Sequence, residues 1–249
     1  MEIDKIYNMD CLEGMKHIPD GSIDAVVTSP PYNFNLRIHY GQYGGWSDKD
    51  PNKYGNMMND RLPMEEYFQW QRDCINEMLR VSKGLVFYNI QMITGNKVAL
   101  CKILGEFADK VKDVIIWDKK NAEPAINEGV LNSQFEYIIV FDKATAIARQ
   151  FPVFNAERGT VSNVWPICKN TEHNILNHSA MFPLDLPRKI VRLFTNESDL
   201  VLDPFMGSGT TAVACIKEKR HFIGFELNKQ YYDKACKRIS AERRQLTLF

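Results

Sequence analysis

The sequence lacks any hydrophobic run long enough to cross a membrane. Its longest apolar stretches, such as residues 85–88 and 138–141, are far shorter than the roughly 18 residues that a bilayer requires. The N-terminus has no basic region followed by an apolar one, so it does not read as a secretion signal. We therefore expect a cytoplasmic protein that is neither inserted nor exported.

The sequence also lacks net charge, because 31 Lys and Arg residues balance 31 Asp and Glu residues. This balance argues against a protein that coats polyanions in bulk, although it permits a local basic face. Six cysteines occur without a CxxC pair, and His173 and His178 have no carboxylate at metal spacing. Neither a disulfide framework nor a metal site is expected.

What is present is the composition of a globular α/β domain. With 45% apolar and 25% charged residues over 249 positions, disorder, collagen and coiled coil are excluded. Apolar runs alternate with segments of helical period, which indicates a mostly parallel sheet. The expected strands are 22–28, 85–90, 114–117, 137–141, 200–202 and 222–225. The expected helices are 65–81, 98–107, 182–194, one that follows Thr211 and ends at Lys219, and one capped by Asn228. Residues 33–63 and 142–177 follow neither period, so we expect functional loops there.

A glycine loop follows the strand that ends near Leu202. Gly207 and Gly209 stand where strand turns to helix, and Glu226 ends the next strand nineteen positions after the first glycine. Glycines let the backbone approach a ligand, and an acid at this spacing accepts hydrogen bonds from ribose hydroxyls. Because no Lys-Ser/Thr pair follows, a Walker-type phosphate loop is excluded. The expected ligand contains adenosine without a polyphosphate; a plain tight turn is the alternative.

A second motif, Ser29-Pro30-Pro31-Tyr32, cuts off the first predicted strand. Prolines cannot continue a sheet ladder, and they leave carbonyls without a local amide partner. Those carbonyls and the Ser29 hydroxyl can accept hydrogen bonds from an exocyclic amino group, while Tyr32 offers a ring that stacks on a planar base. A rigid loop whose tyrosine merely packs is the structural alternative.

The two motifs together resemble a known family. Residues 28–32 (TSPPY) and 203–211 (DPFMGSGTT) closely resemble the catalytic and cofactor motifs of DNA amino-methyltransferases, and their order resembles the β class. The resemblance implies a Rossmann-like methyltransferase fold, S-adenosylmethionine as cofactor, DNA as substrate, and a circularly permuted order with the catalytic half first. It implies catalytic roles for Ser29, Pro30, Pro31 and Tyr32, and cofactor binding by Asp10, Cys11, Phe182, Asp203, Phe205, Gly207, Ser208, Gly209, Thr210, Glu226 and Leu227.

The resemblance also divides the single domain, 1–249. The catalytic half would cover about 1–141 with an inserted loop at 33–63, a target-recognition segment about 142–177, and the cofactor half about 178–249. Two basic stretches in the loop and the recognition segment are expected to grip DNA through Arg37, His39, Lys53, Arg61, Arg149, Arg158 and Lys169. A cognate restriction endonuclease is a candidate partner, in a prokaryotic or phage-infected cell.

The chemistry of the motif favours an amine over a ring carbon. Methylation of a ring carbon needs a cysteine nucleophile after a proline, and none of the six cysteines follows one. Cytosine N4 and adenine N6 both present an amino donor beside a ring nitrogen, so the residues alone leave both open. In the family, serine at position 29 leans towards cytosine. An NAD-type oxidoreductase would explain residues 207–226 and leave Ser29 to Tyr32 without a role; a catalytically silent DNA-binding relative is the other alternative.

Overall fold

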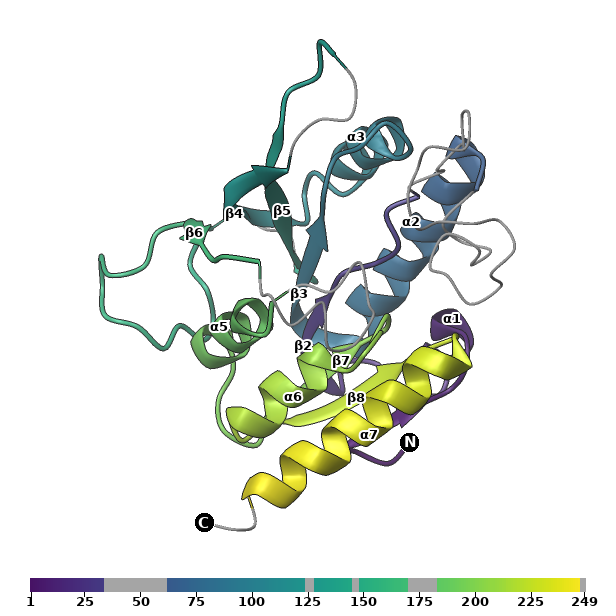
Figure 1. Ribbon diagram of the computed structural model, residues 1–249, viewed down its shortest axis with the longest axis vertical. Helices are drawn as coiled ribbons and strands as arrows, with labels where there is room; N and C mark the ends of the chain where they lie inside the picture. Colours follow the sequence, from purple (N-terminus) through teal and green to yellow (C-terminus); the bar gives the residue numbers. More distant parts are fainter. Residues whose placement is uncertain (34–61, 124–127, 145–147, 170–182, 247–249) are drawn as a thin grey trace.

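The protein is built on one eight-stranded sheet with helices on both faces (Figure 1). A computed structural model describes residues 1–33, 62–123, 128–144, 148–169 and 183–246. The strands lie in the order β1-β8-β7-β2-β3-β5-β4-β6. Within the described ranges, no helix is both long and apolar enough to cross a membrane.

Five neighbouring strands form the parallel part of the sheet. They are β1 (Lys5–Tyr7), β8 (His221–Phe225), β7 (Leu200–Asp203), β2 (Ile23–Thr28) and β3 (Ser82–Ile90). Apolar residues fill these strands because both faces are covered. The predictions for β2, β3, β7 and β8 are confirmed. The three-residue strand β1 is too short to give a periodic signal, and it was not predicted.

The other edge of the sheet departs from the parallel arrangement. β4 (Val111–Glu123) and β5 (Ser133–Asp142) form an antiparallel hairpin, and β5 runs antiparallel to β3. The sequence predicted both strands, although not their direction. β6 (Val164–Pro166) pairs in parallel with β4. The expectation that residues 142–177 form a loop without a regular element is therefore wrong. Residues 164–166 form a short strand, and the ring of its central residue, Trp165, is buried.

Two apolar layers attach the helices to the sheet. On one face lie α1 (Cys11–Met15), α2 (Met64–Val81) and α3 (Lys97–Glu106), and on the other α5 (Asp185–Phe194), α6 (Thr210–Lys217) and α7 (Lys229–Leu246). The helix predictions are confirmed within a few residues, and the Asn228 Oδ1 caps α7 by accepting from the amides of Gln230 and Tyr231. The short helix α1 was not predicted.

The sheet brings the two sequence motifs to one edge. In the register, Ala25 of β2 pairs with Val201 of β7, and Asp203 pairs with Gly224 of β8. The carboxyl ends of these parallel strands therefore meet, and this is the edge where open α/β sheets bind ligands.

Candidate active site

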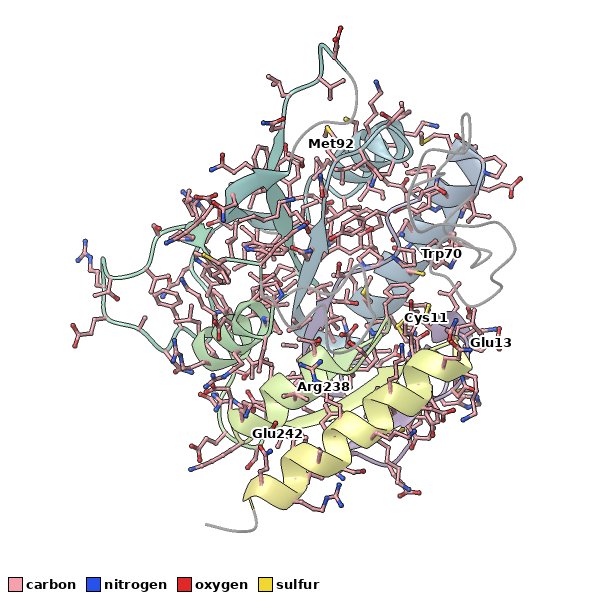
Figure 2. The ribbon with its side chains drawn as sticks, viewed as in Figure 1. Cys11, Glu13, Trp70, Met92, Arg238 and Glu242 are labelled. Carbon is pink, nitrogen blue, oxygen red and sulfur yellow. The ribbon has the colours of Figure 1, made fainter. Side chains whose placement is uncertain are left out.

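The glycine loop between β7 and α6 depends on backbone that only glycine adopts easily. Gly207 has φ 54° and Gly209, the residue before α6, has φ 85°. A Cβ at Gly209 would lie 3.2 Å from the Cβ of Ala235, so α7 also closes off this position. At the start of α6, Arg238 of α7 donates a 2.9 Å hydrogen bond to Oγ1 of Thr210 (Figure 2). The loop is thus a rigid turn whose backbone is held at the carboxyl end of β7.

Glu226 lies directly behind this turn. Its side chain is buried, Oε2 accepts a 2.8 Å hydrogen bond from the amide of Gly207, and Oε1 accepts one of 2.7 Å from the amide of Asn228. Burial raises the pKa of Glu226 to about 7, although these two amides act in the opposite direction. A carboxylate has about four lone-pair sites, so this one retains acceptors for two further donors. Vicinal ribose hydroxyls, such as those of S-adenosylmethionine, fit that requirement.

Residues 8–11, near the N-terminus, lie next to Glu226. Asn8 donates a 2.7 Å hydrogen bond to the carbonyl of Glu226, and Asp10 caps α1 by accepting from the amides of Leu12 and Glu13. The thiol of Cys11 is buried 3.9 Å from that of Cys74, so its side chain faces the core. Of the predicted cofactor residues, Cys11 can therefore offer its backbone to a ligand but not its thiol.

Three more predicted cofactor residues differ in their surroundings. Trp70 projects from α2 (Figure 2), and the ring of Phe205 packs against it in an edge-on arrangement with 5.6 Å between the centroids. Ser208 is buried, whereas Leu227 is about half exposed beyond β8. Phe182 lies outside the described residues. Trp70 was not singled out in the sequence, because its spacing in α2 fits an ordinary core face.

The Ser-Pro-Pro-Tyr motif follows β2, as expected. The carbonyl of Pro31 accepts hydrogen bonds from the Tyr67 hydroxyl at 2.8 Å and from the Gln71 amide at 3.4 Å. Among the described residues, none donates to the carbonyl of Pro30. The two proline carbonyls therefore differ: the Pro31 carbonyl holds the motif on α2, whereas the Pro30 carbonyl receives no hydrogen bond from a described residue.

The side chains of the motif belong to a buried polar network that the sequence did not predict. The hydroxyls of Ser29 and Tyr32 lie 3.0 Å apart, and Tyr32 donates a 2.7 Å hydrogen bond to Oε2 of Glu136 on β5. Asn89 of β3 donates to Tyr32 Oη at 2.7 Å and to Glu136 Oε2 at 2.9 Å. Lys119 of β4, fully buried, lies 3.5 Å from Oε1 of Glu136. The hydroxyl of Tyr32 is thus held in place by Glu136 and Asn89.

One polar atom of this network has no hydrogen-bond partner among the residues that the structure describes. The Asn89 Oδ1 is buried, and no described residue donates a hydrogen bond to it. A buried acceptor left unpaired costs about 1–3 kcal/mol, which favours a site that a ligand completes. In the sequence, Lys119 and Glu136 are charges inside two strand patterns, and that irregularity is the signal that could have pointed to them. Their meeting depends on the register of the β4–β5 hairpin, which the sequence does not fix.

A second buried contact joins the two motifs. Asp203, at the end of β7, accepts hydrogen bonds from the hydroxyls of Thr28 at 2.7 Å and Thr211 at 2.6 Å, and from the amide of Phe205 at 3.0 Å. Burial raises the pKa of Asp203 to about 6, against the effect of these donors. Asp203 therefore organises the glycine loop from within the protein.

The residues expected to grip DNA are described only in part. Arg37, His39, Lys53 and Arg61 lie outside the described residues. In the 142–177 segment, Arg149 forms an ion pair with Asp113 and stays largely exposed. The same segment also has a structural role, because Phe151 and Phe154 pack on Phe194 at the end of α5.

The comparisons with known proteins agree with this architecture. The family model described as DNA methylase, for N6 and N4 methyltransferases, matches residues 23–237. M.BglII, a type II methyltransferase from Bacillus subtilis, is 29% identical over 96% of this chain and 70% of its own length. The PvuII DNA methyltransferase, described as cytosine-N4-specific, superposes with a TM-score of 0.69 at 20% identity, covering 97% of this chain and 91% of its own. The M1.HpyAVI–SAM complex superposes with a TM-score of 0.62 at 26% identity over 94% and 98%.

The mostly parallel α/β sheet has the fold of solved DNA methyltransferase structures. The chain belongs to the family of N6/N4 DNA methylases. It is an S-adenosylmethionine-dependent DNA amino-methyltransferase, related to enzymes of type II restriction–modification. The sequence-based identification of the family is confirmed, and the oxidoreductase and silent-binder alternatives are set aside.

Proposed function

We propose that this enzyme methylates N4 of a cytosine that is flipped out of duplex DNA. The observation that carries the proposal is the neutral Ser29 hydroxyl at the first position of the motif, beside the available carbonyl of Pro30. In the family that the motif resembles, serine there favours cytosine.

Two acceptors on this chain prepare the amine for attack. An exocyclic amino group is a poor nucleophile because its lone pair is conjugated with the ring. Hydrogen bonds to Ser29 Oγ and to the Pro30 carbonyl favour a pyramidal nitrogen, and a bond that strengthens as the nitrogen pyramidalises lowers the barrier. Since Pro31 is held by Tyr67 and Gln71, the position of both acceptors is fixed before the base arrives.

Tyr32 holds the base. The target cannot meet the cofactor inside a duplex, so it leaves the helix at a cost of a few kcal/mol. Stacking on the Tyr32 ring stabilises the flipped base by roughly 1–3 kcal/mol and offsets part of this cost. The hydrogen bond from Tyr32 to Glu136 restricts the rotation of the ring and so sets the plane of the base.

The other half of the site holds the cofactor. S-adenosylmethionine, when bound, supplies an electrophilic methyl group on a sulfonium. Glu226 accepts hydrogen bonds from the ribose hydroxyls with its remaining lone pairs. The turn at Gly207 and Gly209 lets the backbone approach the cofactor closely. The remaining proposed cofactor contacts come from Asp10, Cys11, Phe182, Asp203, Phe205, Ser208, Thr210 and Leu227.

We further infer the organisation of the chain around this site. The catalytic half is about 1–141, the cofactor half about 178–249, and residues 142–177 with the loop 33–63 contact DNA. The proposed catalytic motif follows β2 and the glycine loop follows β7, an order that supports the circularly permuted arrangement proposed for the β class. A cognate restriction endonuclease is the proposed partner in the cell.

The base is identified by one experiment. The protein is expressed in a host that lacks endogenous methylation, the DNA is digested to nucleosides, and the products are quantified by mass spectrometry. We expect N4-methylcytosine in the wild type and its loss in Ser29→Ala. N6-methyladenine in place of N4-methylcytosine would refute the choice of base, and 5-methylcytosine would refute the amine mechanism.

A further inference from the structure

The network below Ser29 has a fixed direction. Tyr32 donates to Glu136, and the two amide hydrogens of Asn89 are directed to Glu136 and Tyr32, with a longer contact of 3.4 Å to Ser29. An ionised carboxylate only accepts hydrogen bonds, so Glu136 obliges Tyr32 to donate to it. The Tyr32 oxygen then accepts from Ser29, whose hydrogen is directed inward. Ser29 Oγ is left as an acceptor facing the substrate amine.

The ion pair at the base of the network has little value for stability alone. Lys119 is fully buried and Glu136 nearly so, with 3.5 Å between Nζ and Oε1. Removing two charges from water is expensive, and a buried pair of this kind is often no more stable than a packed apolar pair. Glu136 is hydrogen-bonded to Tyr32, which in turn is hydrogen-bonded to Ser29. This chain of hydrogen bonds connects the ion pair with the proposed reaction.

We infer that Glu136 is a positioning residue that sets Ser29 as an acceptor and receives the proton that the amine loses. During transfer, a bond forms between the amino nitrogen and the methyl carbon while the bond between that carbon and sulfur breaks, leaving its electron pair on sulfur. The nitrogen becomes cationic and must lose one hydrogen. That proton passes to Ser29 Oγ, the Ser29 proton passes to Tyr32 Oη, and the Tyr32 proton passes to Glu136 Oε2.

This series of proton transfers, the relay, is balanced, and its final acceptor, Glu136, can keep the proton. Ser29 and Tyr32 finish as neutral hydroxyls, Glu136 finishes as a neutral acid, and no other reactant is needed. A hydroxyl is a very weak base, so neither Ser29 nor Tyr32 can keep the proton, whereas a carboxylate can. The inference rests on the proposed catalytic set of Ser29, Pro30 and Tyr32, but it applies equally to cytosine and adenine, because only the amino group takes part.

The test compares Glu136→Gln with Tyr32→Phe and with the double variant. Gln keeps the size of the side chain and removes its basicity; Phe keeps the stacking ring and the Lys119–Glu136 pair but removes the bridging hydroxyl. Single-turnover transfer of a tritiated methyl group to host DNA is measured together with the affinity for S-adenosylmethionine by calorimetry. Glu128→Gln, the same change at an exposed carboxylate of the β4–β5 hairpin, is the matched control.

We expect each single variant to lower the single-turnover rate roughly 100-fold or more. Cofactor affinity should stay within about twofold, a split that general misfolding would not produce. The double variant should lose no more than Tyr32→Phe alone, because both changes break the same chain. If Glu136→Gln does not fold, a folded Tyr32→Phe that transfers at the wild-type rate refutes the relay on its own.

Two further outcomes would overturn the inference: a wild-type rate in Glu136→Gln, or losses that multiply in the double variant. Tritium counting does not depend on which base is modified. N6-methyladenine in the wild type would therefore refute the choice of cytosine while leaving the relay tested separately.

Discussion

The hydroxyl of Thr28, the last residue of β2, donates a 2.7 Å hydrogen bond to Oδ1 of Asp203, the last residue of β7. This bond joins the strand that carries the catalytic motif to the strand that carries the glycine loop. Asp203 also accepts hydrogen bonds from the Thr211 hydroxyl and the amide of Phe205, so one buried carboxylate is bonded to both halves of the site. Methyl transfer depends on the distance between amine and methyl group, and we expect this contact to help set that distance because it joins the two strands.

We therefore expect Asp203→Asn to impair both halves at once. Asn cannot accept from two hydroxyls and an amide as a carboxylate does, and an unsatisfied buried donor costs about 1–3 kcal/mol. Thermal unfolding should shift down accordingly, and both cofactor affinity and transfer rate should fall. Glu197→Gln, at an exposed carboxylate just before β7, is the control and should match the wild type. Loss of transfer with unchanged stability and cofactor affinity would show that Asp203 is not a shared support.

Stability without cofactor should fall as the pH rises. Burial raises the pKa of Glu226 from 4.5 to about 7, so between these values the folded protein holds a proton that the unfolded chain has released. The contribution of Glu226 to the unfolding free energy then decreases by roughly 3 kcal/mol with rising pH across this window and is level outside it. Asp203, with a pKa of about 6, acts in the same direction.

Denaturant unfolding of the wild type and Glu226→Gln between pH 4 and 8.5 isolates the part due to Glu226. The wild type should lose stability relative to the variant as the pH increases from about 4.5 to 7. A difference between the two proteins that does not vary with pH would contradict the role assigned to burial of this carboxyl.

Cofactor affinity should change with pH in the opposite sense. In the proposed site, ribose hydroxyls donate to the ionised carboxylate, so binding of S-adenosylmethionine should favour the deprotonated form of Glu226. Affinity should weaken roughly tenfold from pH 8 to pH 6, because the empty site takes up a proton as the pH falls below about 7. Glu226→Ala should weaken binding by roughly 1.5–3 kcal/mol, and the remaining affinity should lose this pH dependence. Unchanged cofactor affinity in that variant, measured by calorimetry, would remove the assignment.

How much of this could be predicted from the sequence differs between the two halves of the site. The glycine turn and Glu226 follow from local spacing in one βαβ unit, and the structure places the Gly207 amide against that carboxylate. The Ser-Pro-Pro-Tyr turn at the end of β2 follows equally from local sequence. Such features depend on residues near each other in the chain, and local rules describe them well.

The polar network beneath Tyr32 could not be predicted in the same way. Glu136 and Lys119 reach it from an antiparallel hairpin, and a shift of one residue in that register would point both charges to the opposite face. For the same reason β6 was missed, since three residues joined to β4 leave no period. The sequence also suggested stacking as the role of Tyr32 without indicating that its hydroxyl is held by Glu136.

DNA affinity should depend on salt through the proposed contact segment. Arg149, Arg158 and Lys169 are replaced singly by Ala, and Kd for a duplex is measured from 50 to 300 mM salt, a window in which phosphate contacts dominate. Each lost contact should reduce the log–log slope by about 0.9. Arg149 is largely exposed, so its loss should hardly affect stability. Lys16→Ala, at an exposed residue after α1, serves as control. If all three variants keep the wild-type slope, the DNA-binding face lies elsewhere.

The chemistry of the motif predicts that no covalent intermediate forms with DNA. Carbon methylation needs a thiolate that attacks the ring, and a cytosine analogue such as 5-fluorocytosine then traps the enzyme on DNA. In the proposed site the acceptors around the amine are the Ser29 hydroxyl and the Pro30 carbonyl, neither of which is a nucleophile for the ring. We expect turnover, or at most reversible binding, on DNA that contains 5-fluorocytosine, with no adduct on a denaturing gel. Ser29→Ala should lower the single-turnover rate more than it lowers cofactor affinity, because its hydrogen bond is strongest as the nitrogen pyramidalises. A trapped adduct would mean that the reaction proceeds through ring carbon, and equal losses of rate and cofactor affinity in Ser29→Ala would assign this residue to binding instead of transfer.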